Sequence, residues 1–318
     1  MNREIFFKKM GVLKGYPDLV KLTEQAYIDL EHKVWKENLE DSPHGRPWHT
    51  SFHASQFPSQ TRPCGRKAIY TMMDVPNAEP ISPFLRGVAE IGKAVEQQIV
   101  HRWGFAGLTI GGSVALVEGS ETAQIRFADD DTWLTGAADA ILDLRPSCDT
   151  VLPVDVKSKT TAVLDAMIAG ERSYDEKHYI QVQAYIYLCR KYHVEMGWQD
   201  LGLKPAESGY IFYSSREDPR KTKEFYVEAD YNLINDGIET LHEWKKNFLS
   251  GDLPERPKSW YWTIDPCKWC DFKKHVCKPD YKDKVTKIED SHAMTFTKEL
   301  RKNYDPEKIK ERVLSRWN

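Results

Sequence analysis

Apolar positions along the chain recur with two different periods, and segments of the two kinds alternate. Apolar residues three or four apart, typical of amphipathic helices, occur at 16–39, 82–104, 176–192 and 231–249. Short apolar or alternating runs bounded by Gly, Asp or Pro predict strands at 112–118, 122–128, 132–144, 150–158, 207–215 and 222–230. This order predicts an α/β fold with a mixed central sheet flanked by helices.

Two segments of different character flank this patterned region. Residues 1–62 hold one helical pattern and then an irregular stretch rich in Ser, His and Pro, so we expect a helical N-terminal segment. Residues 63–280 carry the predicted sheet, and residues 281–318 are charged and predict a helical tail. The chain has no internal repeat and no low-complexity segment, which excludes a repeat architecture.

Composition and charge limit the class of protein and the compartment that we expect for it. The chain has 318 residues, of which 41% are hydrophobic and 29% charged, which is enough for a sizeable core. The first residues have charge inside their only apolar patch, and no run of about 18 apolar residues exists, so we expect neither a signal peptide nor a membrane span. We therefore expect a cytoplasmic protein, in which clustered cysteines more often bind metal than form disulfides. A net charge of −3 gives no global basic signature for nucleic acid, so such binding would need local patches.

Two aspartates and a lysine lie close together in the strand-forming middle of the chain. Asp139 follows the small residues of "TGAA", and "PVDVKSK" places Asp155 and Lys157 two residues apart. Residues i and i+2 of a strand share one face, so Asp155 and Lys157 would project into the same cleft. Two carboxylates can bind a divalent metal that activates water against a phosphate, and a lysine can orient that water or neutralise charge. Alone, so short a pattern is more typical of a solvated edge strand.

The flanking helices add further candidates. Gly92 precedes Glu96 by one helical turn, so close packing at the glycine would aim Glu96 at the same metal. Gln181 and Tyr185 are i and i+4 on the downstream helix and share a face. Each pair has an ordinary structural explanation by itself. The order Gly-xxx-Glu, Asp, Asp-x-Lys, Gln-xxx-Tyr is much harder to obtain by accident.

Half of the six cysteines lie in one short stretch, "PCKWCDFKKHVC". They are Cys267, Cys270 and Cys277. This spacing can supply three corners of a tetrahedral metal site. The fourth ligand is either local, as His275, which suits zinc, or distant, as Cys64, Cys148 or Cys189, which suits zinc or an iron-sulfur cluster. Because Cys189 lies on an apolar helix and Cys148 in a predicted turn, we interpret both as structural.

The motifs "GKAVE", "GAADA", "DVK" and "QVQAY", in this order, resemble the active-site series of the PD-(D/E)XK nucleases, in particular their RecB-like branch. "RPCGRKAIY" together with "CKWCDFKKHVC" is similar to the iron-sulfur RecB-like exonucleases, including the CRISPR-associated ones and the AddB nuclease domain. The resemblance covers about Pro63 to Cys277. It implies a restriction-endonuclease-like fold.

The resemblance also implies a function, which is that of a metal-dependent DNA nuclease, acting as an exonuclease on single strands or duplex ends. Mg²⁺ or Mn²⁺ would be held by Glu96, Asp139 and Asp155, with Lys157 beside the attacking water. Gln181 and Tyr185 would position substrate or brace the lysine. RecB-like members commonly carry histidine in place of Glu96, and many related nucleases carry glutamate in place of Asp155.

For the cysteines, the resemblance implies a 4Fe-4S cluster that joins the N-terminal and C-terminal segments. Its ligands would be Cys64, Cys267, Cys270 and Cys277. Zinc held by the last three and His275 is the alternative. The alternative functions are a non-catalytic subunit that binds DNA ends or serves assembly, and a processing endonuclease in recombination or spacer capture. The implied partners are DNA and proteins of recombination or CRISPR-type systems.

Overall fold

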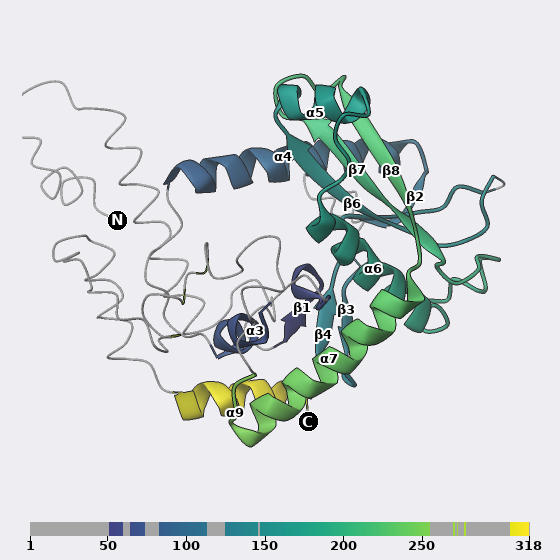
Figure 1. Ribbon diagram of the computed structural model, residues 1–318. Coiled ribbons are helices and arrows are strands. Elements are labelled where there is room, and N and C mark those ends of the chain that lie inside the picture. The colour runs from purple at the N-terminus through teal and green to yellow at the C-terminus, as the bar shows by residue number, and fades with distance from the viewer. Residues whose placement is uncertain are drawn as a thin grey trace, which may run out of the picture. The chain divides into compact units, whose positions relative to one another are not determined.

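A computed structural model describes residues 51–59, 64–73, 83–112, 125–145, 147–254, 270, 272, 277 and 306–317 (Figure 1). The helix predicted at 16–39 and most of the strand predicted at 112–118 lie outside these ranges. The chain divides into two compact units, and the larger unit comprises Pro47–Val75, Ile91–Lys278 and Tyr304–Asn318. The larger unit holds both sheets and is described below.

The main sheet has five strands in the order β2-β5-β6-β7-β8. β6 and β7 run parallel, and the other neighbouring pairs run antiparallel, so the prediction of a mixed sheet is confirmed. The strands are β2 (Thr109–Gly112), β5 (Ala140–Leu142), β6 (Leu152–Lys159), β7 (Ser208–Ser215) and β8 (Thr222–Glu228).

The central strand β6 has a different helix on each of its faces. Val154 and Val156 pack with apolar residues of α4 (Pro83–Phe105). Asp155 lies between them in sequence and therefore faces the opposite side, where its β7 neighbour packs with apolar residues of α6 (Glu176–Lys191). β6 is buried as far as Val156, as expected for a strand covered on both faces. The polar positions of β6 are thus placed on the α6 side.

A second, smaller sheet has the order β1-β4-β3, made of Phe52–His53, Leu134–Gly136 and Phe127–Asp129. The single strand predicted at 132–144 is therefore divided between the two sheets as β4 and β5. Gly136 permits the close packing at this division, since a Cβ there would lie 2.8 Å from Leu188 Cδ1 and 3.0 Å from Ala54 Cβ. Residues 51–59, which the sequence assigns to the N-terminal segment, pack with this part of the core.

The sequence patterns missed two helices of the core. α3 (Gly65–Met72) and α5 (Thr161–Ile168) have only eight residues each, too few for helical periodicity to repeat. The predicted helix α7 (Tyr231–Ser250) is present, with Asp230 as N-cap and Gly251 in the left-handed conformation after its end. α9 (Pro306–Trp317) lies in the predicted helical tail. Among the described helices, none is long and apolar enough to cross a membrane.

Candidate active site

The fold brings Asp139, Asp155 and Lys157 together where β5 begins beside β6. Asp139 directly precedes β5, and its Oδ2 accepts a hydrogen bond of 2.7 Å from the backbone N–H of Val156. Lys157 Nζ donates to Asp155 Oδ1 at 2.5 Å and lies 3.8 Å from Asp139 Oδ2. One ammonium group is therefore shared by two carboxylates, one on β6 and the other just before β5.

Asp155 is fully buried, yet only one of its oxygens is satisfied. Its Oδ2 has no hydrogen-bond partner among the described residues. Burial raises the pKa of Asp155, and the nearby carboxylates Asp139 and Glu96 raise it further, while Lys157 opposes the rise. Burial likewise raises the pKa of Asp139. A buried carboxylate oxygen without a donor is costly, and it is the kind of ligand that hard divalent cations prefer.

The two carboxylates favour the charged form of Lys157. Burial disfavours its charged form, but the carboxylates of Asp155 and Asp139 outweigh burial, so the pKa of Lys157 is raised. In its charged form this ammonium cannot remove a proton from water. Lys157 can instead bind an anion, such as a phosphate oxygen, or orient a water molecule through its donors.

Glu96 reaches the same neighbourhood from α4. A Cβ at Gly92 would lie 3.1 Å from Ser158 Oγ of β6, so the close packing predicted at this glycine is found. Glu96 also raises the pKa values of Asp155 and Lys157, although burial and the nearer charged groups have larger effects on both. Nevertheless, the described part of the chain holds no group of three or more His, Cys, Asp or Glu side chains arranged to bind a metal. Glu96 is near the two aspartates but does not complete a three-ligand site with them.

Gln181 and Tyr185 lie on the face of α6 that approaches the carboxylates. Gln181 Nε2 donates to Tyr185 Oη at 2.6 Å, so the predicted i, i+4 contact is present. Tyr185 is 1% exposed. Burial raises the pKa of Tyr185, and Asp155 and Asp139 add to the rise, which places its hydroxyl in the field of both aspartates.

The sequence analysis did not identify a second group of polar residues farther along β6. Lys159 Nζ donates to Asp175 Oδ2 at 2.5 Å. Tyr213, the β7 neighbour of Lys157, has its hydroxyl 2.7 Å from His178 Nδ1 and accepts the Asp175 N–H at 3.1 Å. Burial lowers the pKa of His178 to about 3, and nearby lysines, first Lys157, contribute. The continued alternation in "DVKSK" was a signal for Lys159. No sequence pattern indicated His178 or Tyr213.

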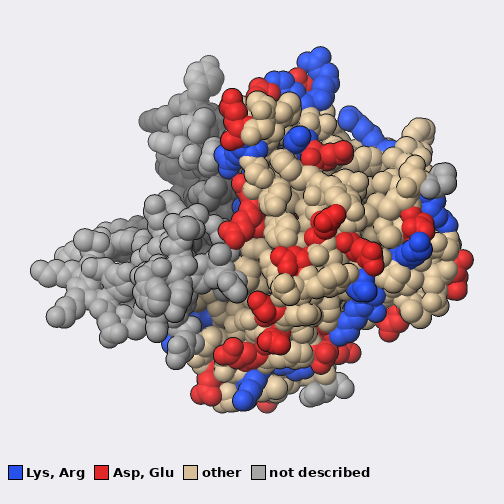
Figure 2. Space-filling model, turned by 45° about the vertical axis from the view of Figure 1, so that its right-hand side comes forward, with Lys and Arg blue, Asp and Glu red and all other residues tan. Residues whose placement is uncertain are grey.

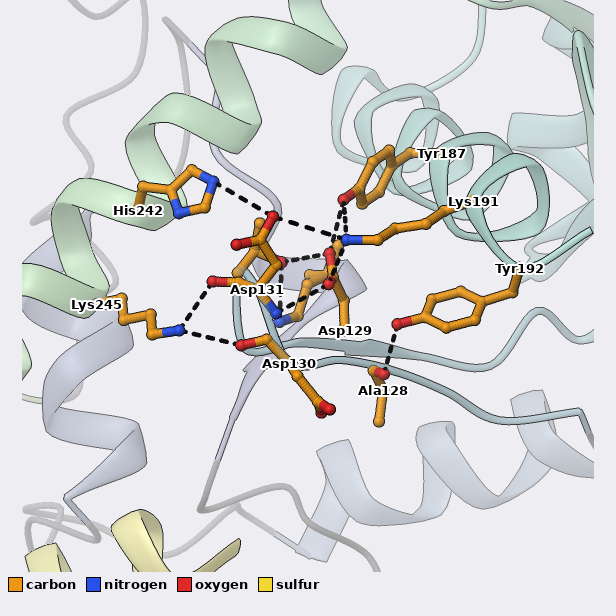
Figure 3. Close-up of polar contacts among 11 residues, drawn as sticks. Ala128, Asp129, Asp130, Asp131, Tyr187, Lys191, Tyr192, His242 and Lys245 are labelled. Carbon is orange, nitrogen blue, oxygen red and sulfur yellow. Dashed lines mark hydrogen bonds and ion pairs between the residues drawn. The ribbon is translucent and has the colours of Figure 1, made fainter. Parts of the chain in front are cut away.

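Another polar cluster, also unpredicted, surrounds the turn between β3 and β4 (Figure 3). Asp129 is 1% exposed and accepts hydrogen bonds from Thr132 Oγ1, Tyr187 Oη and Lys191 Nζ, at 2.8, 2.6 and 2.6 Å, and from the Asp131 N–H at 3.1 Å. Burial raises the pKa of Asp129, but Lys191, Tyr187 and Thr132 outweigh it, so the pKa is lowered. Because protein donors bind both of its oxygens, this carboxylate anchors α6 to the turn.

Helices α7 and α9 hold the same turn from other directions. Lys245 Nζ of α7 donates to the carbonyl oxygens of Asp130 and Asp131 at 3.0 and 2.9 Å (Figure 3). Trp133 has a φ of 58°, which is strained for a residue with a large side chain. Its ring stacks on Trp317 of α9 with centroids 5.9 Å apart. These contacts keep the turn in one conformation.

Cys64, which we predicted as the distant fourth ligand, lies near the two described C-terminal cysteines. Burial raises the pKa of Cys64, and Coulombic repulsion from Cys270 and Cys277 adds to the rise. Tyr70 and Phe272, with ring centroids 5.3 Å apart, form a small buried cluster with Cys277, and Cys270 packs against it. The three described thiols thus converge from opposite ends of the core, but they do not form a metal-binding arrangement by themselves.

The remaining cysteine candidates are placed as follows. Cys267 and His275 lie outside the described residues. Cys189 is 0% exposed in the main apolar core, so its interpretation as a buried hydrophobic residue is confirmed. Cys148 Sγ lies 3.1 Å from Thr150 Oγ1.

No protein-family model matches this sequence, and no curated protein matches it. Among solved structures, the chain is similar to SSO0001, with 13% identity and a TM-score of 0.40 over 77% of this chain and 93% of that one. It is also similar to the exonuclease LHK-Exo of Laribacter hongkongensis in complex with dAMP, with 12% identity and a TM-score of 0.37 over 64% of this chain and 90% of that one. A phage-related exonuclease from Haemophilus somnus 129PT gives 14% identity and a TM-score of 0.33, over 64% and 97% of the two chains. These TM-scores are all low, and the likenesses carry no functional argument.

Proposed function

We propose that the protein is a divalent-metal-dependent DNA nuclease of the PD-(D/E)XK type, acting as an exonuclease on single strands or duplex ends. The observation that carries this proposal is the buried Asp155, whose Oδ2 has no partner among the described residues although Asp139 and Lys157 adjoin it. A structural carboxylate at this depth is usually hydrogen-bonded on both oxygens. An oxygen left open beside a second carboxylate and a lysine fits a site for a cation and a phosphate.

Each residue then has a distinct role. Asp139 and Asp155 would hold Mg²⁺ or Mn²⁺, which supplies a water of lowered pKa and charge stabilisation at the phosphate. Lys157, kept protonated by the two carboxylates, would bind a phosphate oxygen or orient the water. Glu96 would join as a third ligand if its side chain moved toward the two aspartates. Gln181 and Tyr185 would line the site on the α6 side, where they position substrate or brace Lys157.

We further propose that the cysteines hold a 4Fe-4S cluster through Cys64, Cys267, Cys270 and Cys277. The convergence of Cys64 with Cys270 and Cys277 supports a ligand set drawn from both ends of the core. Such a cluster would be structural, because it would close a loop of most of the chain and restrict the unfolded state.

The nuclease is tested by incubating purified protein with end-labelled single-stranded and double-stranded DNA, with Mg²⁺, Mn²⁺ or EDTA. We expect metal-dependent shortening of the DNA, and loss of most activity in Lys157→Ala with the fold retained. DNA binding without cleavage under every metal condition would favour the non-catalytic subunit. Internal cuts in circular single strands would favour the processing endonuclease.

The cluster is tested by anaerobic purification and metal analysis. A 4Fe-4S cluster on these four thiolates predicts a brown protein with about four irons per chain. Cys64→Ser should lose iron and stability, while His275→Ala should keep both. A colourless protein with one zinc, which loses it in His275→Ala and keeps it in Cys64→Ser, would show that zinc is held by the local ligands instead.

A further inference from the structure

Lys159 extends the row of charged side chains that begins with Asp155 and Lys157. The three residues are i, i+2 and i+4 on β6 and share the side of the sheet that faces α6. Their Cα atoms are therefore spaced by about 6.6 Å along the strand. This step is comparable to the separation of neighbouring phosphates in an extended nucleic-acid strand. A phosphate beside Lys157 could thus have its neighbour beside Lys159.

The side chain of Asp175 orients Lys159 and does not cap the N-terminus of α6. Asp175 is the N-cap residue of α6, but its side chain makes no capping hydrogen bond. Its carboxylate instead accepts from Lys159 Nζ at 2.5 Å and from Arg172 Nη2 at 3.2 Å. Burial raises the pKa of Asp175, but Lys159 and then Arg172 outweigh it and lower the pKa to about 2. Asp175 therefore stays anionic and keeps both cations oriented at neutral pH.

The group formed by Lys159, Arg172 and Asp175 has a net positive charge, because two cations share one carboxylate. An ammonium has three donors, of which Asp175 takes one. The Lys159 Nζ also lies 5.4 Å from the centroid of the Tyr213 ring, which limits its movement. The side chains of Lys159 and Arg172 are 16% and 48% exposed, so solvent reaches both. A phosphate would meet donors that are already ordered, which lowers the entropy cost of binding.

We propose that Lys159 and Arg172 form a phosphate-binding subsite, which takes the phosphate next to the one that is cleaved, with Asp175 as a positioning residue. This inference rests on the proposed nuclease function. It makes the substrate a strand that extends at least one phosphate beyond the cleaved bond. On the face shown in Figure 2, basic and acidic side chains are interspersed and form no continuous basic surface. That face therefore offers a polyanion local charged groups and no extended basic surface.

The test measures binding without cleavage, by fluorescence anisotropy of a labelled single-stranded oligonucleotide in EDTA at several salt concentrations. Lys159→Ala and Arg172→Ala should each weaken binding about tenfold at low salt, because each removes a charge-assisted hydrogen bond. Each should also lower the slope of log affinity against log salt by about 0.7. Lys159→Arg should keep the parent slope. Thermal melting confirms that the variants are folded, and Lys159→Gln replaces Lys159→Ala if the alanine variant is not.

Lys204→Ala is the matched control. Lys204 is also paired with one aspartate, with its Nζ 2.7 Å from Asp149 Oδ2. It forms a β-bridge with Thr150, which precedes the first residue of β6, whereas Lys159 is the last residue of that strand. This variant should bind as the parent does. A second measurement compares dinucleotides with and without a terminal phosphate as competitors. The phosphorylated form should compete better against the parent and lose that advantage against Lys159→Ala.

Lys159 and Arg172 variants that match Lys204→Ala in affinity, slope and competition would overturn the subsite. That result is distinct from failure of the nuclease itself. A parent that binds DNA through Lys159 but cuts none would refute the nuclease and leave the binding subsite standing. A parent that cuts DNA while its Lys159 variants bind DNA normally would refute the subsite and leave the nuclease function standing.

Discussion

Asp129 and Asp155 are both buried aspartates beside a lysine, and the protein treats them in opposite ways. Asp129 accepts hydrogen bonds on both oxygens and has a lowered pKa. Asp155 accepts one from Lys157, leaves Oδ2 without a described partner, and has a raised pKa. Complete pairing makes a buried charge an anchor, whereas incomplete pairing leaves a cost that folding alone does not explain. The difference separates a structural carboxylate from a candidate metal ligand without reference to any relative.

The largest expected effect is loss of metal binding and activity in Asp155→Asn. In the parent, Mn²⁺ at a hundred times its dissociation constant should stabilise the fold by about 2.7 kcal/mol, measured by thermal unfolding. Asp155→Asn should lose this stabilisation and about 10³-fold in cleavage rate, because it removes a charged ligand. Asp129→Asn should retain the response to Mn²⁺. Equal responses in the two variants would contradict the distinction between the carboxylates.

The next effect is on stability and should fall on Asp129. Asp129→Asn should lower the free energy of unfolding by about 3 kcal/mol. The Lys191 ammonium would then lie beside a neutral side chain, and the NH₂ group of the asparagine would face groups that are themselves hydrogen-bond donors. Urea unfolding without metal measures this change. Asp131→Asn is the control, since that side chain is 67% exposed, and it should change stability by less than about 0.5 kcal/mol. A loss in Asp155→Asn as large as that in Asp129→Asn would remove the contrast.

A smaller effect is the pH dependence of each variant's stability relative to the parent, measured in EDTA. The lowered pKa of Asp129 gives stability that is present above the ordinary carboxyl pKa of about 4 and is lost as pH falls through the folded value. The raised pKa of Asp155 has the opposite sign. Between about pH 4 and that raised value, the folded parent binds more protons than the unfolded parent. As pH falls through this range, the parent should therefore become more stable relative to the Asp155→Asn variant, which has no carboxyl group there. Slopes of the same sign would show that one assignment is wrong.

The smallest effect concerns the approach of Glu96. In Gly92→Ala, the new methyl group would meet Ser158 Oγ at 3.1 Å and move α4 slightly outward. We expect a several-fold loss of cleavage with a change in stability below about 1 kcal/mol, since the contact is with a small polar side chain. Ser158→Ala in the same chain should restore part of the activity. No loss in Gly92→Ala would argue against a role for Glu96.

Local periodicity in the sequence determined the parts of this protein that depend on neighbours in the chain. The alternation in β6 placed Asp155 and Lys157 on one face, and helical spacing placed Gln181 beside Tyr185. Backbone geometry fixes such i, i+2 and i, i+4 relations wherever the strand or helix forms. The order of elements likewise gave the mixed sheet with flanking helices.

Only the tertiary structure decided which charges are buried and which of them are paired. Three consecutive aspartates separate the strands predicted at 122–128 and 132–144, and nothing local distinguishes them, yet Asp129 is buried because Tyr187 and Lys191 of α6 close over it. Asp175 precedes the helix predicted at 176–192, but its carboxylate binds Lys159 of β6 and does not cap α6. These partners are 16 to 62 residues apart in the sequence, and no local period relates them. Their contacts arise when helices and sheets pack, because only then does burial set the cost that each carboxylate must offset by pairing.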